Sequence, residues 1–133
     1  MDRLSELLES NRFEELETDT LELKPLPSKG GEWTNIYQSA CALLNTRGGI
    51  ILIGVKEEGT GLSRTYRLTG FRSEGEQKLN QLWQQFRDEA GRPLDIEDRF
   101  PPPQLFDFRG EQLCAVFVDE LPADIKFAFF NGN

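Results

Sequence analysis

The sequence predicts an α/β fold in which a mixed central sheet carries helices packed on it. A strand pattern, a helix pattern and a second strand pattern follow one another between residues 20 and 55. This order favours a right-handed crossover between two parallel strands and leaves antiparallel pairing as the alternative. A further apolar strand pattern lies at residues 113–118. The chain of 133 residues suits one domain with a modest core, so we expect a single domain over residues 1–133.

The stretch at residues 45–55 is the centre of this prediction. Residues 50–53 are all apolar, so a strand here must be covered on both faces by other layers. Gly48 and Gly49 allow the chain to turn sharply off the preceding helix, because glycine tolerates positive φ. Gly54 predicts a bend, a bulge or the close approach of another group.

The segments before this central strand predict two helices and one strand. Leucines at i, i+3 and i+4 predict a short amphipathic helix over residues 3–10. Residues 20–24 alternate between apolar and polar side chains, which predicts a strand with one buried face. A strong helical stripe then covers residues 33–44, and it consists of Trp33, Ile36, Tyr37, Ala40, Leu43 and Leu44.

The segments after the central strand are less regular. The polar residues 56–61 predict a turn, and residues 64–69 predict a strand. The sequence at 73–76 has the spacing of a capping box. A helical stripe follows, which Gly91 and Pro93 would end, and it consists of Leu79, Leu82, Trp83, Phe86 and Ala90.

A hairpin is expected over residues 105–118, with its turn at 109–111 and an interior strand at 113–118. The tail from residue 121 is apolar but ends at Asn131-Gly132-Asn133, directly after an aromatic run. We therefore expect a further strand beyond this point, which would make the chain the N-terminal module of a longer protein.

The composition restricts the chemistry. The chain has no histidine and two isolated cysteines, Cys41 and Cys114, which argues against a structural zinc site and favours buried free thiols. The net charge of −8 argues against a broad basic surface, but it leaves room for a local basic groove. Acidic residues near the N-terminus and the lack of a long apolar run predict a cytoplasmic protein without a membrane span.

One group of carboxylates is a candidate metal and catalytic site. Glu17, Glu22 and Lys24 follow the pattern Glu-x4-Glu-x-Lys, and such side chains can hold a divalent metal and steady a phosphate. Glu22 and Lys24 share a strand face, whereas Glu17 joins them only if residues 18–20 bend. Glu57 and Glu58, which follow the central strand, could supply a third carboxylate if the two strands are neighbours. The alternative is a solvated strand face with a weak Glu–Lys pair.

Four basic residues flank the central strand and form a candidate nucleic-acid-binding patch. They are Arg47, Lys56, Arg64 and Arg67. The alternative is that they are scattered, solvated charges. The glycine pairs match neither a P-loop nor a dinucleotide-binding pattern, so we expect structural turns there. Trp33 and Trp83 lie on helical stripes and are expected in the core.

Three motifs together resemble the Schlafen AlbA-like domain. They are Glu-Thr-Asp-Thr-Leu-Glu-Leu-Lys at 17–24, Ala-Leu-Leu-Asn-Thr at 42–46 and Gly-Gly-Ile-Ile-Leu-Ile-Gly-Val at 48–55. That family has a Glu-Phe-Lys strand, an Ala-Phe-Ala-Asn-Thr helix end, and Gly-Gly before an apolar strand ending Ile-Gly-Val. Residues 69–71 and 101–122 resemble its later elements, so the likeness covers residues 13–122 in order.

The resemblance implies a domain that binds DNA or RNA. In bacteria such domains are often the N-terminal modules of transcriptional regulators, and a defence protein is the other setting we consider. Related domains in animal Schlafen proteins cleave tRNA and rRNA with three carboxylates and a divalent metal such as Mg²⁺ or Mn²⁺. Glu17 and Glu22 match two of these carboxylates, and Glu57 falls at the third.

Departures from the family pattern affect these implications. Leu23 replaces the usual Phe, Lys56 stands where the family often has Asp, and Glu57 is longer than the nuclease Asp. The nucleases pair two such domains, so this chain would need to form a homodimer or belong to a longer protein. Nucleic-acid binding is the leading function, and a metal-dependent endoribonuclease acting on structured RNA is the second. A dimerisation or protein-interaction domain, favoured by the acidic charge, is the third.

Overall fold

The computed structural model of the chain describes residues 21–27, 33–59 and 65–130. The expected helix at 3–10 lies outside these residues. The elements in order are β1 (Leu21–Lys24), α3 (Trp33–Asn45), β2 (Gly49–Ile53), β3 (Val55–Glu58), β4 (Thr65–Leu68), α4 (Glu74–Asn80), η3 (Leu82–Gln85), β5 (Phe86–Arg87), η4 (Glu97–Arg99), β6 (Gln104–Phe108), β7 (Glu111–Val118), η5 (Ala123–Ile125) and β8 (Phe129–Phe130).

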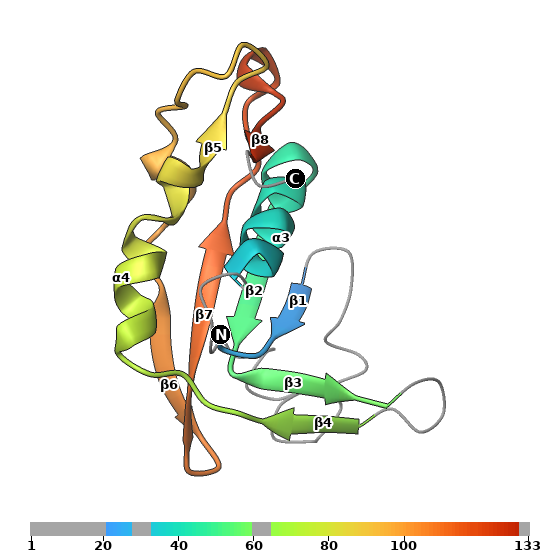
Figure 1. Ribbon diagram of the computed structural model, residues 1–133, viewed down its shortest axis with the longest axis vertical. Coiled ribbons are helices and arrows are strands. Elements are labelled where there is room, and N and C mark those ends of the chain that lie inside the picture. Colours follow the sequence, from blue (N-terminus) through green and yellow to red (C-terminus); the bar gives the residue numbers. More distant parts are fainter. Residues whose placement is uncertain (1–20, 28–32, 60–64, 131–133) are drawn as a thin grey trace.

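A mixed four-stranded sheet in the order β1-β2-β7-β6 forms the centre of the molecule (Figure 1). β1 and β2 are parallel, and α3 connects them, as the crossover prediction requires. β7 runs antiparallel to both of its neighbours, β2 and β6. The α/β class, the mixed sheet and the parallel crossover are therefore confirmed.

The strand β2 lies inside the sheet and is covered on both faces. Ile51 and Ile53 belong to the core cluster that contains the buried face of α3, whereas Leu52 belongs to a second cluster on the other face. All three side chains have no exposed surface. The expected helical stripe is confirmed, because every one of its members is buried in α3: Trp33, Ile36, Tyr37, Ala40, Leu43 and Leu44.

The chain does not form a polar turn after β2, and that prediction was wrong. It bends at Gly54, which has φ +119°, and begins a new strand, β3, at Val55. A Cβ atom at Gly54 would lie 2.6 Å from Leu113 Cδ2, so only glycine fits at this bend. β3 pairs antiparallel with β4, the strand expected near residues 64–69, and the two form a separate ribbon (Figure 1).

The helix expected to extend to Ala90 ends ten residues earlier, at Asn80. A 3₁₀ turn follows, and Phe86 enters the short strand β5, where it pairs with Phe130 of β8. Phe86 is fully buried, and its ring stacks on Phe100 with centroids 6.0 Å apart. Burial between these partners therefore overrides the local helical spacing. The expected cap also fails, since the side chain of Ser73 makes no capping hydrogen bond.

The hairpin β6–β7 is confirmed, with a tighter turn than expected. Only Arg109 (φ 51°) and Gly110 (φ 83°) connect the two strands, which is the geometry of a type I′ turn. β7 lies inside the sheet, as its apolar sequence predicts, and β6 is an outer strand. No helix among the described residues is long and apolar enough to cross a membrane.

Candidate nucleic-acid interface

Glu22 and Lys24 lie next to each other on β1. Their side chains share a face, with Lys24 Nζ 4.0 Å from Glu22 Oε2. The strand register pairs Glu22 with Ile51, so both side chains lie on the α3 side of the sheet. The Glu22 side chain is 37% exposed and the Lys24 side chain is 27% exposed. A pair this exposed to solvent contributes little to stability.

Glu57 lies on β3, on the face of the ribbon that carries Val55 and Tyr66. Those two residues pack against the cluster that contains Leu23, on the sheet face opposite to Glu22. The structure therefore does not bring Glu57 to Glu22, and Glu17 lies outside the described residues. Within the described ranges no three His, Cys, Asp or Glu side chains form a metal-binding group. These residues alone do not fit a divalent metal, and the three-carboxylate site stays a prediction.

Lys56 and Arg67 come together on the β3–β4 ribbon. They are direct register partners and are both exposed, on the face opposite to Val55 and Tyr66. Arg67 Nε donates to Glu58 Oε1 at 3.0 Å on the same face. This face, which we call the ribbon face, therefore presents two cations and one carboxylate from a structure that projects from the sheet (Figure 1).

Arg47 does not join the ribbon face. It lies between α3 and the start of β2, whereas Lys56 follows the other end of β2. The five residues of β2 separate the two side chains by roughly 16 Å along the strand. Arg64, in the loop between β3 and β4, lies outside the described residues. Two of the four predicted basic residues are thus gathered on one surface.

Residues 17–128 match the model of the family Schlafen, AlbA_2. The chain belongs to the Schlafen AlbA_2 family. This confirms the resemblance seen in the motifs around Glu22, Asn45 and Gly54. No curated protein matches this Schlafen AlbA_2 domain at a significant level.

A solved structure with the same fold is the solution NMR structure of the N-terminal domain of a RecG-related protein from Nitrosomonas europaea. The two chains are 20% identical, with a TM-score of 0.66, over 95% of this chain and 78% of the other. At this level of identity the likeness establishes the fold alone.

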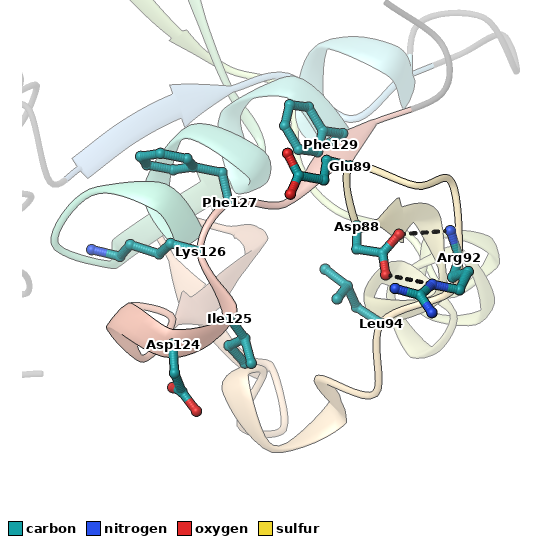
Figure 2. A pocket seen from close by; sticks show the side chains of 9 residues that line it. All are labelled: Asp88, Glu89, Arg92, Leu94, Asp124, Ile125, Lys126, Phe127 and Phe129. Carbon is teal, nitrogen blue, oxygen red and sulfur yellow. Dashed lines mark hydrogen bonds and ion pairs between the residues drawn. The ribbon is translucent and has the colours of Figure 1, made fainter.

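The Schlafen AlbA_2 domain also has a surface hollow of about 290 Å³ that the sequence did not predict (Figure 2). Figure 2 shows Phe127 and Phe129 on one side of it, and these are 58% and 47% exposed. Asp88 lies on another side and binds Arg92 Nε at 3.0 Å. The backbone N–H of Arg92, which donates to the Asp88 carboxylate, lowers the pKa of Asp88. The aromatic run at residues 127–130 is the sequence signal that could have indicated this surface.

The strand β4 was expected, but β3 and its pairing with β4 were missed, although a signal for them exists. Burial alternates along residues 65–68, Val55 is buried beside the exposed Lys56, and the loop between the two strands contains Gly59 and Gly61. Two short strands around a glycine-containing loop are typical of a hairpin. Val55 and Leu68 are the only aliphatic residues in the two strands. The polar residues that follow Val55 therefore favoured the prediction of a turn over that of a strand.

Proposed function

We propose that this domain binds nucleic acid, either DNA or RNA, through the ribbon face of β3 and β4. The observation that carries the proposal is the direct pairing of two exposed cations, Lys56 and Arg67, on a projecting ribbon. Membership of the Schlafen AlbA_2 family supports it. Further support comes from the structural relative, whose name links it to the DNA helicase RecG.

The geometry of the ribbon suits contacts to phosphates. A two-stranded ribbon is narrow enough to enter the major groove of B-form DNA, and side chains on its outer face then reach the backbone. Lys and Arg that neutralise phosphates release counterions, which makes the affinity depend on salt. The acidic net charge of −8 confines favourable contacts to a small area, so we expect weak binding with a shallow salt dependence.

The test measures fluorescence anisotropy of a labelled DNA duplex and of labelled tRNA over a series of salt concentrations. Lys56→Ala and Arg67→Ala should each weaken binding and reduce the salt slope on duplex DNA by roughly 0.9. Glu58→Gln should strengthen binding, because it removes the carboxylate that pairs with Arg67. Lys78→Ala, an exposed lysine on α4, is the matched control and should leave both quantities unchanged.

Two results would count against this proposal. Absence of binding to both nucleic acids at low salt would refute the function. Equal losses of affinity in Lys78→Ala and Lys56→Ala would refute the placement of the site on the ribbon face. Such a result would mean that binding depends on the net charge and not on the position of the lysine.

A metal-dependent endoribonuclease acting on structured RNA is the second candidate. It is supported by the partly exposed Glu22 and Lys24, which share one face of β1 and keep the family spacing. Because the described residues do not fit a metal by themselves, we derive no reaction step. The candidate predicts that tRNA cleavage requires Mn²⁺ or Mg²⁺ and is abolished by Glu22→Ala while the fold survives. Glu97→Ala is the carboxylate control, and cleavage retained in Glu22→Ala would eliminate the candidate.

The proposal also includes the setting of the domain. We infer that it is the N-terminal module of a longer cytoplasmic regulator or defence protein, and that it forms a homodimer to double its small basic surface. Sedimentation velocity with and without DNA tests the last point, because a monomer on DNA at all concentrations would exclude pairing on the nucleic acid.

A further inference from the structure

The outer edge of β6 presents backbone groups without partners in the sheet. Phe108 and Glu111 close a two-residue hairpin, and such a closing pair exchanges both of its hydrogen bonds. Along β6 the bonded pairs then alternate, so Leu105 and Asp107 direct their N–H and C=O groups away from β7. Among the described residues, no backbone hydrogen bond outside the helices and strands involves Leu105 or Asp107. The edge thus offers two donors and two acceptors at strand spacing.

An apolar groove runs beside this edge. A hollow of about 230 Å³ lies between α4 and the start of β6, and a second of about 200 Å³ adjoins it through Leu79 and Pro102. Leu79 and Cys114 line it as buried residues, whereas the side chain of Leu105 is 41% exposed. Leu105 and Cys114 are register partners, so they share one face of the sheet. Every second side chain of a strand added to β6 would face this groove.

The charges around the groove are negative. Glu76 on α4 lines it, and Asp107 shares a face with Leu105 two residues along β6. Both carboxylates are exposed, and within the described part of the chain neither belongs to an ion pair. β6 also lacks the Lys or Pro that edge strands commonly use to prevent pairing. If a second copy of the chain paired with β6 about Phe106, Asp107 of one copy would lie opposite the apolar Leu105 of the other. The carboxylate would then gain no cation, so the charges favour a basic peptide over a second copy.

We propose that the outer edge of β6 and the apolar groove between α4 and β6 together bind an extended peptide that adds a strand to the sheet. Backbone hydrogen bonds to Leu105 and Asp107 set its position. An apolar residue of the peptide covers Leu105 and Leu79, and a Lys or Arg two residues away pairs with Asp107. Glu76 extends the same preference for positive charge at the helix side of the groove. This site is separate from the ribbon face, so the two proposals stand or fall independently.

The experiment selects linear peptides from a phage-displayed random library on the intact chain, and then titrates the best synthetic peptide into isotope-labelled protein. We expect selected sequences to carry an apolar and a basic residue two positions apart. We also expect the amides of Leu105 and Asp107 to become protected from hydrogen exchange. Asp107→Pro should weaken binding roughly tenfold, because it removes an outward N–H while the bonds of β6 to β7 remain.

The matched variant Asp107→Asn keeps that N–H and loses only the charge, so its affinity should fall less and the loss should vanish at high salt. If Asp107→Pro does not fold, Leu105→Glu serves instead, because it places a carboxylate in the groove from an exposed position.

Four results would overturn the proposal. The library could yield no binding sequence, or the peptides could shift resonances at Phe127 and Phe129 rather than on β6. An unchanged peptide affinity in Asp107→Pro would show that the peptide does not pair with the backbone of β6. Finally, a dimer in sedimentation that Asp107→Pro dissociates would assign the edge to a second copy of the chain.

Discussion

Asn45 and Ala128 hydrogen-bond to each other in both directions. The side-chain Nδ2 of Asn45 donates to the carbonyl of Ala128 at 2.9 Å, and the N–H of Ala128 donates to Asn45 Oδ1 at 2.8 Å. Asn45 is the last residue of α3, and Ala128 precedes β8 in the chain, so the amide attaches the C-terminal segment to the central helix. The thiol of Cys41 donates to the same carbonyl at 3.3 Å.

Asn45→Ala should lower the free energy of unfolding by about 1–3 kcal/mol, because it leaves the buried N–H of Ala128 without a partner and leaves the Ala128 carbonyl with only the weak thiol donor of Cys41. Ala128 is only 2% exposed, so water replaces the lost bonds poorly. Urea denaturation followed by circular dichroism measures the change. Asn45→Asp should also destabilise, since its carboxylate accepts from the Ala128 N–H but repels the Ala128 carbonyl.

The control for Asn45 is Thr46→Ala, which removes a hydrogen bond from the exposed Thr46 hydroxyl to the carbonyl of Ala42. Its cost should stay below that of Asn45→Ala, because water can satisfy the exposed groups. Equal stability losses in the two variants would show that the contact with Ala128 has no special weight.

Gly54→Ala should destabilise the fold by about 3 kcal/mol or more, since it combines a strained backbone with a steric clash. The added Cβ would lie 2.6 Å from Leu113 Cδ2 and 3.2 Å from the backbone of Gly70. Gly110→Ala separates the two effects, because φ is also positive there but no heavy atom lies within 4 Å. It should cost only about 1–2 kcal/mol. Thermal unfolding of both variants gives the difference, and similar losses would mean that close packing at Gly54 is unimportant.

Asp88→Asn should reduce stability near neutral pH, with an effect that disappears in acid. The backbone N–H groups of Arg92 and Ala90, together with the Arg92 side chain, hold the pKa of Asp88 below its usual value of 3.8. A carboxyl with a lower pKa in the folded chain stabilises the fold above the unfolded pKa, and this stabilisation is lost as the pH falls through the folded pKa.

The stabilities of wild type and Asp88→Asn should therefore differ most above pH 3.8 and converge below it. Urea unfolding at a series of pH values measures the two curves. Asp95→Asn, a nearby exposed carboxyl, is the control. A constant difference between wild type and Asp88→Asn at every pH would contradict the assignment.

Cys114 should resist alkylation in the native protein, whereas Cys41 should react first. Burial, with a smaller contribution from the Glu76 carboxylate, raises the pKa of the Cys114 thiol to about 12. Burial also raises the pKa of Cys41, but its hydrogen bond with Asn45 acts in the opposite direction, and Cys41 is only half-buried. Thiolate is the reactive form, so Cys114 remains inert near neutral pH.

Iodoacetamide labelling followed by peptide mass spectrometry measures both rates, and labelling in guanidinium gives the unfolded reference. Native labelling of Cys114 at the rate of Cys41 would indicate that the sheet opens locally around β7.

Much of the central fold followed from the sequence because its signals are strong and local. The stripe from Trp33 to Leu44 can only be buried as a helix, and the apolar run ending at Ile53 can only be buried inside a sheet. The order of these elements then implied the parallel crossover that β1 and β2 form. The family followed from the same stretch, because it holds the motifs that residues 17–128 share with Schlafen AlbA_2.

The candidate site was only partly predictable. Lys56 and Arg67 lie eleven positions apart in the sequence, and only the β3–β4 register makes them neighbours. Arg47 is nearer to Lys56 in sequence but lies at the opposite end of β2. The spacing of Glu22 and Lys24 did predict their shared face, because alternation within one strand is a local property.

The sequence by itself determined the central strand, the helix that crosses over it, the β6–β7 hairpin and the family. Packing in the folded chain decided that the bend at Gly54 leads into a paired ribbon, and that Phe86 leaves the helical path. Each of those outcomes depends on a partner far away in the chain: Leu113 and Gly70 at the bend, and Phe130 and Phe100 around Phe86. Local periodicity reports which side chains seek burial, but the partners that bury them are set by packing across the whole fold.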